Sequence, residues 1–473
     1  MTGFDTVLIA NRGEIALRVA RTCRALGLSV VAVCSTADRD SAVTRLADRT
    51  VHIGPTRSSA SYRNAAALIE AARMTGAQAI HPGYGFLSED ADFAEACAVS
   101  GLTFIGPSAD VMRLLGEKSA ARAAMAAAGL PLLPGAVEPV ADATEATALA
   151  ARIGYPVIIK AVAGGGGRGL RVVWRPGDLA AAFAETTANA RALFADGRVY
   201  LERYLTGARH VEVQVLCDGH GNGVHLGVRD CSVQRRHQKL IEETPAPGLP
   251  AEVTGRMAGA ALSAALETGY TGAGTFEFLV DGAGRFSFLE VNCRIQVEHP
   301  VTEEVTGVDL VAEQLRIAAG EQLSQMDITP RGAAVECRIN AEDPAHGFAP
   351  APGTLTEFAP PAGPFVRVDT HAFPGYRIPA AYDSLLAKVI TWGPDRDTAL
   401  ARMRAALAEF RVAGPGIRTT ADFLAGVLSD PRFVQARHDT RLLAGPEDGT
   451  TRSEPTRLPQ KQEEQRGESL PRG

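Results

Sequence analysis

Lysine is scarce in this chain of 473 residues, which holds five lysines against 43 arginines. A lysine that persists against such a bias is a candidate for a position that needs a compact point charge on a flexible stem, because a planar guanidinium does not imitate one. The five are Lys118, Lys160, Lys239, Lys388 and Lys461. Lys461 lies in a polar tail, so we expect a special role only among the other four.

Other absences exclude whole classes of protein. The sequence has no run of 18 apolar residues, which argues against a membrane span. Its net charge of −6 gives no electrostatic basis for binding nucleic acid or a membrane surface. The seven cysteines form no CxxC pair, so we expect reduced thiols and neither a disulfide framework nor a zinc site. No basic segment precedes an apolar one at the N-terminus, so we expect no secretory signal and a cytoplasmic protein.

The order of apolar and polar segments predicts several domains. Residues 1–117 alternate short apolar strands with amphipathic helices, which predicts a parallel sheet covered by helices. No GxGxxG follows the first strand, which argues against a dinucleotide site there. We expect a second domain over 118–325, which includes a small lobe of strands and helices over 133–204, and a third over 331–445. Residues 446–473 are nearly devoid of apolar side chains, which predicts a disordered tail.

A glycine-rich loop lies between two predicted strands in "YPVIIKAVAGGGGRGLRVV". Gly164, Gly166 and Gly169 match GxGxxG, but a strand follows instead of a helix, and no Gly-Lys-Ser/Thr is present. Neither a dinucleotide fingerprint nor a Walker A loop therefore fits. A hairpin tip without side chains suits a mobile lid whose backbone N–H groups meet phosphates. An ordinary flexible turn is the alternative at this point.

A period of two runs through "FLEVNCRIQVEHP", residues 288–300. Apolar residues at odd positions 289–297 alternate with polar residues, so an extended chain would place five of each kind on opposite faces. The polar ones are Glu290, Asn292, Arg294, Gln296 and Glu298. A solvated face is the ordinary explanation. Asparagine is a poor strand former, however, so the composition of this face favours a binding site.

The preceding hairpin brings further acidic groups to this face. In "TFEFLVDGAGRFSFLEVN", a turn over 281–284 that pairs Val280 with Arg285 would place Glu290 and Asn292 on the same face as Glu277. Neighbouring carboxylates repel each other across strands. Mg²⁺ would resolve the repulsion, because it binds one or two carboxylates together with substrate phosphates. A solvated acidic hairpin is the alternative.

Basic residues complete a predicted ATP–Mg²⁺ site. Lys118, Lys160 and Lys239 are available for phosphate groups. Beyond the metal ligands, the fork of Arg294 could hold a small anionic substrate, and Glu298 is a candidate general base.

Seven segments occur in the order in which one family carries them: "IANRGEIALR", "IHPGYGFLSE", "YPVIIKA…GGGGRG", "VRDCSVQRRHQKLIEE", "GAGTFEFL", "RIQVEHPVTE" and "AVECRINAEDP". Together they resemble biotin carboxylase, the ATP-grasp component of biotin-dependent carboxylases, over about residues 4–445. The resemblance implies an ATP-grasp fold of mixed α/β and α+β class, with a Rossmann-like N-terminal domain, a mobile lid and a C-terminal domain. It also implies that ATP phosphorylates bicarbonate to carboxyphosphate and that biotin is then carboxylated, as in an acyl-CoA carboxylase of acetyl- or propionyl-CoA type.

The resemblance also implies roles for individual residues, and it gives none to Lys388. The residues it places at ATP are Lys118, Lys160, Gly165, Gly166, Gly167, Glu202, Tyr204, Leu205, His210, Gln234, His237, Glu277 and Glu290. Those it places at Mg²⁺ or Mn²⁺ are Glu277, Glu290 and Asn292. Those it places at bicarbonate and biotin are Lys239, Arg294, Gln296, the backbone of Val297, Glu298, Arg338, Tyr84 and Gly85. Catalysis is expected from Glu298 as the base and Arg338 as the group that stabilises the biotin enolate, with Lys239 and Arg294.

None of the five lysines lies in Met-Lys-Met, the sequence that carries biotin in such systems. The expected partners are therefore a separate biotin carboxyl carrier protein and carboxyltransferase subunits, and the family implies a homodimer. Two alternatives stay open. One is an ATP-grasp ligase that activates bicarbonate or another carboxylate for a nitrogen acceptor other than biotin, which "RIQVEHP" and Arg338 disfavour. The other is an inactive regulatory homologue, which the presence of every expected catalytic group disfavours.

Overall fold

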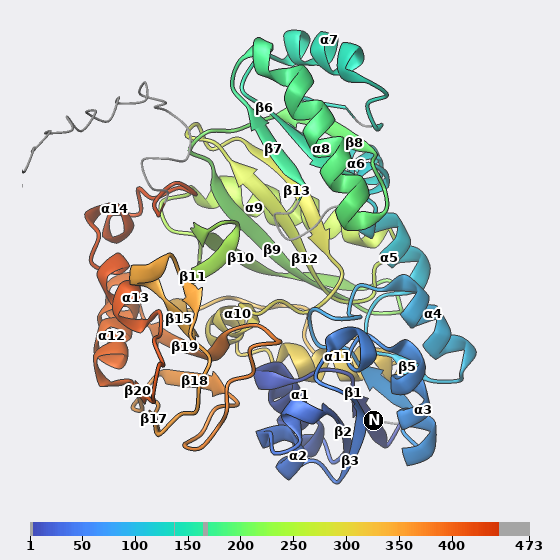
Figure 1. Ribbon diagram of the computed structural model, residues 1–473, viewed down its shortest axis with the longest axis vertical. Coiled ribbons are helices and arrows are strands. Elements are labelled where there is room, and N and C mark those ends of the chain that lie inside the picture. Colours follow the sequence, from blue (N-terminus) through green and yellow to red (C-terminus); the bar gives the residue numbers. More distant parts are fainter. Residues whose placement is uncertain (1–2, 137, 164–168, 444–473) are drawn as a thin grey trace, which may run out of the picture.

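The computed structural model describes residues 3–136, 138–163 and 169–443. Figure 1 shows a lower lobe that contains the N-terminus, an upper lobe, and a long twisted sheet between them that continues into the C-terminal region. Outside the described ranges lie the tail over 446–473 and three glycines with a predicted role, Gly165, Gly166 and Gly167. Within those ranges, no helix combines the length and the apolar character that crossing a membrane requires.

The lower lobe contains a five-stranded parallel sheet in the order β3-β2-β1-β4-β5. Its strands are β1 (Thr6–Ile9), β2 (Ser29–Ser35), β3 (Arg49–Gly54), β4 (Ala79–His81) and β5 (Thr103–Phe104). The helices of this lobe are α1 (Gly13–Ala25), α2 (Ala42–Leu46), α3 (Ala65–Thr75), α4 (Ala91–Val99) and α5 (Ala109–Gly116), with single turns η1 (Thr36–Asp38) and η2 (Ser58–Ala60). Val7 and Ile9 pack in one apolar cluster and Leu8 in another, so both faces of β1 are buried. The predicted helix-covered parallel sheet is confirmed.

The upper lobe corresponds to the small lobe predicted over 133–204 (Figure 1). It follows α6 (Lys118–Ala127), and its antiparallel sheet β7-β6-β8 consists of β6 (Val157–Ala161), β7 (Leu170–Val173) and β8 (Val199–Arg203). Its helices are α7 (Ala143–Ile153), η3 (Pro176–Asp178) and α8 (Leu179–Phe194). Val157 and Ile159 pack against these helices, so Lys160 lies on the opposite face of β6. β6 pairs with β7, which confirms the hairpin predicted around the glycine loop.

One antiparallel sheet of eight strands, in the order β13-β12-β9-β10-β11-β14-β19-β18, forms the body of the molecule. Its strands are β9 (Arg209–Cys217), β10 (Gly223–Arg235), β11 (Gln238–Thr244), β12 (Gly272–Val280), β13 (Phe286–Asn292), β14 (Ala333–Asn340), β18 (Val366–Thr370) and β19 (Leu385–Gly393). β11 pairs with β14. Strands of the regions predicted as second and third domains are therefore joined by backbone hydrogen bonds into one sheet.

Helices cover this sheet, and smaller elements border it. The helices are α9 (Ala251–Glu267), α10 (His299–Thr306), α11 (Leu310–Ala318), α12 (Arg396–Glu409), α13 (Ala421–Val427), α14 (Pro431–Val434) and the short η4 (Pro344–His346). Two further strand pairs are β15 (Glu342–Asp343) with β16 (Ala349–Pro350) and β17 (Glu357–Ala359) with β20 (Arg411–Ala413). α9 packs on β9 and β10, and α12 packs on β14 and β19, so each half of the sheet has its own helical cover.

The predicted register of the β12–β13 hairpin is wrong by one residue. Val280 pairs with Phe286, not with Arg285, because the Asp281 carboxylate accepts from the backbone N–H of Arg285 and holds that residue in the turn. A β-bulge between Glu277 and Phe278 then shifts the register again. The two shifts bring Glu277 directly opposite Glu290, so the predicted meeting of carboxylates occurs despite the incorrect register.

The period of two beyond Asn292 does not correspond to a strand, so this prediction is wrong as well. β13 ends at Asn292, where the backbone N–H of the next residue, Cys293, donates to the Glu89 carboxylate at 3.0 Å instead of to a strand. The chain then turns into α10, whose first turn contains Pro300. The polar residues after Asn292 therefore reach the site from a loop.

Candidate active site

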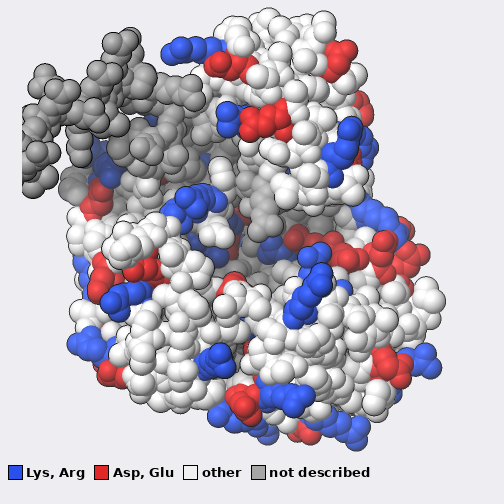
Figure 2. Space-filling view, viewed as in Figure 1, with Lys and Arg blue, Asp and Glu red and all other residues white. Residues whose placement is uncertain are grey.

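The strand β9 separates the apolar core from a polar face of the large sheet. Val211, Val213 and Val215 pack in the cluster that includes α9, so His210 and Glu212 point to the opposite face. Both polar side chains are nevertheless buried. Buried charges cost free energy unless they are paired. The residues that pair with His210 and Glu212 therefore identify the candidate site. In the same orientation as Figure 1, the surface is hollowed between the upper lobe and the body, and charged side chains of both signs gather there (Figure 2).

Lys239, on β11, lies at the centre of the polar face. Its ammonium donates to carboxylate oxygens of Glu212 at 2.5 Å, Glu277 at 2.9 Å and Glu298 at 2.5 Å. Burial lowers the pKa of Lys239, but these carboxylates outweigh burial and raise the pKa well above its usual value. The lysine is therefore a permanent positive charge at the meeting point of three strands and the loop before α10.

Glu212 and Arg229 form a buried pair that sequence patterns did not identify. Arg229 lies opposite Glu212 in the β9–β10 ladder, donates to it at 2.5 Å, and also donates to Gln214 at 2.9 Å and Thr302 at 3.0 Å. The alternation in "HVEVQV" did place Glu212 on the same face as His210. No linear pattern relates Arg229 to it, because the pair forms between neighbouring strands.

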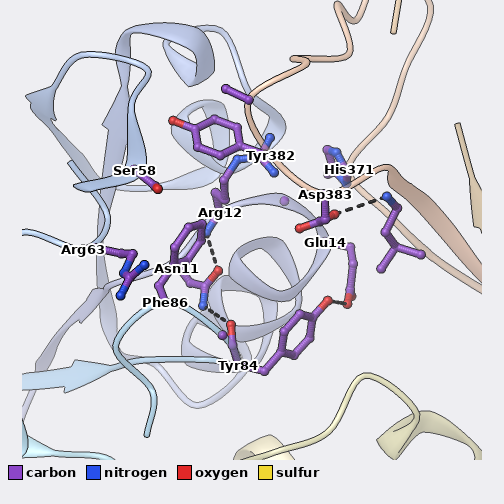
Figure 3. A pocket seen from close by; sticks show the side chains of 14 residues that line it. Asn11, Arg12, Glu14, Ser58, Arg63, Tyr84, Phe86, His371, Tyr382 and Asp383 are labelled. Atoms are coloured by element: carbon purple, nitrogen blue, oxygen red, sulfur yellow. Dashed lines mark hydrogen bonds between the residues drawn. The ribbon is translucent and has the colours of Figure 1, made fainter. Parts of the chain in front are cut away.

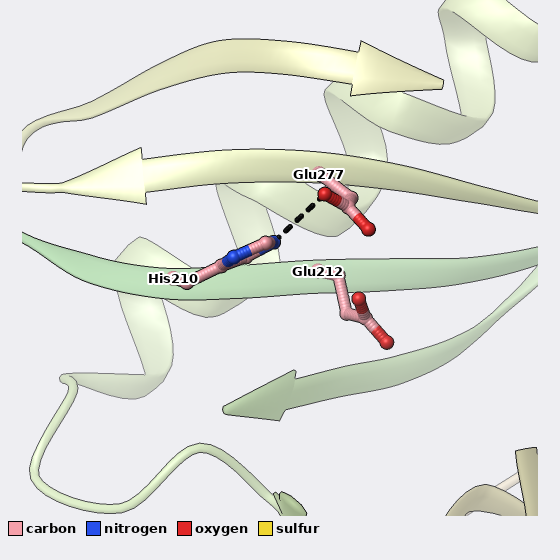
Figure 4. A group of neighbouring side chains, drawn as sticks. All are labelled: His210, Glu212 and Glu277. Atoms are coloured by element: carbon pink, nitrogen blue, oxygen red, sulfur yellow. Dashed lines mark ion pairs between the residues drawn. The ribbon is translucent and has the colours of Figure 1, made fainter. Parts of the chain in front are cut away.

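Glu277 and Glu290, the predicted metal ligands, face each other across β12 and β13. Glu277 also forms an ion pair with His210, 2.9 Å from its Nε2 atom. Figure 4 shows this pair, with Glu212 on the same side of the sheet. Burial raises the pKa of Glu277, but Lys239 and His210 outweigh burial and hold the pKa well below its usual range. Both carboxylates are thus held ionised next to each other.

The donor set of the hairpin suits a hard divalent cation. Carboxylate oxygens such as those of Glu277 and Glu290 are the ligands that Mg²⁺ prefers. Asn292 is placed differently from a simple ligand, because its Nδ2 donates to Glu277 at 2.9 Å and its oxygen accepts from Arg294 at 2.9 Å. The Asn292 amide therefore lies directly beside the carboxylate of Glu277, so the three predicted metal ligands are grouped on one face of the hairpin.

Two of the scarce lysines approach this pair of carboxylates. Lys118, the first residue of α6, donates to Glu290 at 2.8 Å, and it lowers the pKa of Glu290 with a smaller contribution from Lys160. Lys160 itself contacts Glu202 on β8, and Arg122 donates to the same carboxylate at 2.8 Å. Lys160 of the upper lobe is thus close enough to act electrostatically on Glu290 in the body. Its direct ion pair, with Glu202, lies within the upper lobe.

Four other residues predicted at the nucleotide occupy different surroundings. Gln234 reaches the site, since its Nε2 lies 2.7 Å from Nδ1 of His210. Tyr204 packs edge-on against a tryptophan ring at the base of the upper lobe, with centroids 5.9 Å apart, and Leu205 follows it half-buried. His237 is exposed in the turn between β10 and β11, with a positive φ of 64°. The structure thus joins Gln234 to the central cluster and leaves the other three at its margins.

Arg294 and Gln296 extend the cluster along the loop after β13. Arg294 donates to Gln296 at 2.8 Å and to Glu89 at 2.9 Å, while Gln296 donates to Glu277 at 3.2 Å. Glu89, which sequence patterns did not identify, comes from the loop before α4. It fixes both the guanidinium and the start of the loop, so the lower lobe positions this part of the site.

Glu298 and Arg338 complete the site. Arg338 on β14 donates to Glu298 at 2.7 Å and to Glu242 at 2.5 Å. Burial raises the pKa of Glu298, but Lys239 and Arg338 outweigh burial and hold it well below its usual range. Before any substrate binds, Glu298 is therefore an ionised carboxylate between two cations.

Tyr84 and Gly85 line a cavity of about 400 Å³ between the lower lobe and the loop before β19. Figure 3 shows Tyr84 at the edge of this cavity, with Arg12 and Tyr382 farther along its wall. Burial raises the pKa of Tyr84, and Arg338 is close enough to act on it in the opposite direction. The predicted biotin contacts Tyr84 and Gly85 therefore line this cavity together.

The raised pKa of Glu242 predicts that the free energy of unfolding depends on pH. Burial raises its pKa to about 7, so the folded protein binds a proton more tightly than the unfolded chain does. Its contribution to the free energy of unfolding should be complete below the unfolded pKa and should be lost as the pH rises through 7, by up to about 3 kcal/mol. Urea unfolding of the wild type and Glu242→Gln between pH 5 and pH 8 measures it. A stability difference that does not change with pH would contradict this assignment.

A lobe with lysines above a sheet whose edge carries paired carboxylates defines an ATP-grasp protein, and the comparisons agree. The family model for the biotin carboxylase N-terminal domain matches residues 3–112, and that for the biotin carboxylase C-terminal domain matches residues 336–445. Between them, residues 117–326 match the ATP-binding domain of the carbamoyl-phosphate synthase L chain.

Individual relatives agree with the family models. A biotin carboxylase of Pseudomonas aeruginosa is 55% identical over 434 residues, which cover 91% of this chain and 96% of the relative. A crystal structure of a biotin carboxylase–β,γ-ATP complex from Campylobacter jejuni has a TM-score of 0.91 at 47% identity and covers 93% of this chain and 98% of that one. The biotin carboxylase domain dimer of Hydrogenobacter thermophilus 2-oxoglutarate carboxylase, in complex with MgADP, ADP and bicarbonate, has a TM-score of 0.90 at 43% identity, with coverages of 94% and 98%. The chain belongs to the biotin carboxylase family.

Proposed function

We propose that this protein uses ATP and bicarbonate to carboxylate biotin on a separate carrier protein, releasing ADP and phosphate. The observation that supports this most directly is the convergence of Glu212, Glu277 and Glu298 on Lys239, with Arg338 on the other side of Glu298. The end of this cluster at Glu277 suits a metal–triphosphate. The end at Glu298 suits a small anion, with Glu298 beside it as the base. Membership of the biotin carboxylase family supports the same reaction.

The nucleotide end uses the lysines and the facing carboxylates. Lys118 and Lys160 would bind ATP phosphates in place of their present carboxylate partners, and Gln234 would hold His210 toward the nucleotide. Glu202, Tyr204, Leu205 and His237 border this end, and the glycines 165–167 are expected to cover it. Glu277 and Glu290, with Asn292, would hold Mg²⁺ or Mn²⁺, which supplies positive charge to the phosphate oxygens when bound.

The bicarbonate end contains Lys239, Arg294, Gln296 and the backbone of Val297. Bicarbonate would accept hydrogen bonds from the two cations, which fixes it next to Glu298. Glu298 takes the bicarbonate proton, and the resulting oxygen attacks the γ-phosphorus as the bond to ADP breaks. Because bicarbonate would compete with Glu298 for Lys239, its binding weakens the contact that lowers the pKa of the base.

Biotin would lie between Arg338 and the segment of Tyr84 and Gly85. Carboxyphosphate decomposes to CO₂ and phosphate. The released phosphate would take the proton of the ureido nitrogen of biotin, and this nitrogen would then attack CO₂. Negative charge then develops on the ureido oxygen, where a fixed guanidinium stabilises it. The 2.7 Å contact between Arg338 and Glu298 supports a biotin site next to the bicarbonate site.

Replacement of one hairpin carboxylate tests the metal assignment. Glu290→Gln should raise the Mg²⁺ concentration that gives half-maximal ADP formation by about tenfold or more, because an amide is a weaker ligand than a carboxylate. A titration of the rate with MgCl₂ at fixed ATP measures this. Asp281→Asn is the matched control, since Asp281 lies in the turn of the same hairpin and contacts Arg285. An unchanged metal dependence in Glu290→Gln would remove this hairpin as the metal site.

ADP release with and without bicarbonate and free biotin tests the reaction as a whole. We expect release to require bicarbonate and to rise with biotin, and labelled bicarbonate to appear in acid-labile carboxybiotin. Dependence on bicarbonate without any response to biotin would favour an ATP-grasp ligase with another nitrogen acceptor. No ADP release at full substrate supply would favour an inactive homologue.

The wider setting is also part of the proposal. We expect the domains to divide as 1–117, 118–325 with the lid at 133–204, and 331–445. The expected partners are a biotin carboxyl carrier protein and carboxyltransferase subunits of an acyl-CoA carboxylase in the cytoplasm, with a homodimer of this chain. Co-purification of this chain with a biotinylated carrier and a transferase, followed by assay of acetyl-CoA and propionyl-CoA, tests these assignments.

A further inference from the structure

Lys388 is a fully buried lysine to which the expected chemistry gives no task. It lies in the middle of β19, and its side chain is 0% exposed. Its ammonium donates to the backbone carbonyl of Val297 at 2.8 Å and lies 3.2 Å from the Glu14 carboxylate and 3.8 Å from that of Asp369. A lysine retained here, in a chain that uses arginine almost everywhere else, indicates a position that needs a compact charge.

One end of this contact lies in the loop of the bicarbonate site. Val297 stands between Gln296 and Glu298, whose side chains contact Glu277 and Lys239. The loop lies outside β13 and the following helix, so no ladder hydrogen bond fixes the Val297 carbonyl. Lys388 supplies its partner from a strand of the sheet, and it thereby sets the orientation of the peptide from which Glu298 projects.

The other end reaches the segment that lines the cavity. Glu14, in the first turn of α1, accepts a hydrogen bond from the Tyr84 hydroxyl, and Figure 3 shows the two side chains joined at the edge of the cavity. Asn11 fixes the backbone of the same segment through hydrogen bonds to the carbonyls of Pro82 at 2.6 Å and Tyr84 at 2.8 Å. The Tyr84 ring is thus attached to Lys388 through a single carboxylate.

We propose that Lys388 is a positioning residue that couples the Tyr84 segment to the Glu298 loop, through the chain of contacts Tyr84–Glu14–Lys388–Val297. The proposal rests on the proposed function, which places biotin at Tyr84 and bicarbonate at the Glu298 loop. Its consequence is that occupancy of the cavity beside Tyr84 alters the bicarbonate site without any direct contact between the two substrates. Such coupling requires a physically continuous set of contacts, which the four groups provide.

The charge and the size of the side chain both matter for this role. Burial lowers the pKa of Lys388, but Glu14 outweighs burial together with Glu336 and Asp369, so the side chain stays positively charged. A guanidinium is larger and planar, and a side chain without exposed surface has no room for it. We therefore expect Lys388→Arg to behave like Lys388→Met in the assay below, and not to restore function.

The test is a double-mutant cycle of Tyr84→Phe and Lys388→Met. The KM for bicarbonate is measured from ADP release without biotin, so that any direct effect of Tyr84 on biotin does not enter. Tyr84→Phe removes the hydrogen bond to Glu14 and should raise this KM about two- to thirtyfold, with the Kd for ADP unchanged. In the Lys388→Met background, Tyr84→Phe should cause no further rise, because the link is already broken.

Arg396→Met is the matched control for removal of a buried cation. Arg396 pairs with Glu243 at 2.6 Å on the side of the sheet toward α14, so its loss should lower the melting temperature and leave the bicarbonate KM unchanged. An unchanged KM in Tyr84→Phe, or equal effects of Tyr84→Phe with and without Lys388, would overturn the coupling even if Lys388→Met folds poorly. Failure of the wild type to release ADP in response to bicarbonate would instead overturn the proposed function.

Discussion

Glutamine at position 298 should abolish bicarbonate-dependent ADP formation while ADP affinity stays unchanged. The amide of Glu298→Gln cannot take the proton of bicarbonate, and bicarbonate is a poor nucleophile until that proton leaves. Loss of a general base lowers rates by about a hundredfold to ten-thousandfold. Initial rates of ADP release at saturating ATP and bicarbonate, together with ADP binding by calorimetry, measure the two quantities.

The control for Glu298→Gln is another buried glutamate that receives the same isosteric change. Glu313 is buried on α11, and among the described residues it forms its hydrogen bonds with Arg316 and Ser324, away from the central cluster. Glu313→Gln should therefore retain the wild-type rate. Near-normal turnover of Glu298→Gln would remove this residue as the base, whatever the stability of the variant.

The surroundings of Glu298 explain how a strongly acidic carboxylate would serve as the proposed base. In the substrate-free protein, Lys239 and Arg338 together keep its pKa low, so the group is ionised and ready over the whole physiological range. Each cation has a second task, since Lys239 would meet bicarbonate and Arg338 would meet biotin. As both turn toward substrate, their hold on Glu298 weakens and its basicity increases.

Replacement of Arg338 is expected to stop biotin carboxylation and to spare nucleotide binding. Arg338→Gln removes the positive charge that is proposed to stabilise the ureido oxygen, so the yield of carboxybiotin should fall by about a hundredfold or more. The glutamine variant removes the shared cationic partner of Glu298 and Glu242 but keeps a hydrogen-bond donor beside them. Arg338→Ala removes the donor as well, and loss of a buried partner costs about 3–5 kcal/mol of stability. Carboxybiotin is measured from labelled bicarbonate with free biotin as acceptor.

A double variant separates the electrostatic role of Arg338 from its structural role. Arg338→Gln combined with Glu242→Gln removes one of the two carboxylates that lose their partner, so it should recover stability relative to Arg338→Gln alone. It should not recover carboxybiotin formation. An unchanged carboxybiotin yield in Arg338→Gln would discredit the assigned role, and recovery of activity with stability would reduce it to a structural one.

The sequence predicted the chemistry of the site better than its geometry. The alternation over 289–298 identified five polar residues, and all five contribute to the cluster, yet only Glu290 and Asn292 do so from a strand. The remaining three lie in a loop. This loop begins at Cys293, whose backbone N–H donates a hydrogen bond to Glu89. Alternate burial of side chains produces a period of two in the sequence. A loop that distant groups hold in place can bury alternate side chains as well, so the pattern does not distinguish a loop from a strand.

The hairpin shows why register is harder to predict than pairing. The polar turn after Val280 correctly indicated two antiparallel strands, but the Asp281 side chain retains Arg285 in the turn, and a bulge follows at Glu277. Both features depend on local side-chain geometry that residue types do not specify. The two displacements have the same direction and add to two residues, so Glu277 keeps its predicted face and lies directly opposite Glu290.

Residues that act through partners on distant elements were not predictable from the sequence. Arg229 and Glu89 lie in two of the segments that carry the resemblance, "VRDCSVQRRHQKLIEE" and "IHPGYGFLSE", but no role was assigned to either. Their contacts form only when β10 pairs with β9 and when the lower lobe meets the loop after β13. Lys388 is intermediate. The scarcity of lysine marked it as unusual, but only the contacts with Val297 and Glu14 show what it holds.

The central claim is that bicarbonate, activated beside Glu298, attacks the γ-phosphate of ATP. The most direct measurement is the transfer of oxygen-18 from labelled bicarbonate to the phosphate that the enzyme releases, followed by mass spectrometry. In-line attack by a bicarbonate oxygen predicts phosphate with one labelled oxygen at each turnover. Unlabelled phosphate, released at the same rate as ADP, would show that water attacks instead and would contradict the account.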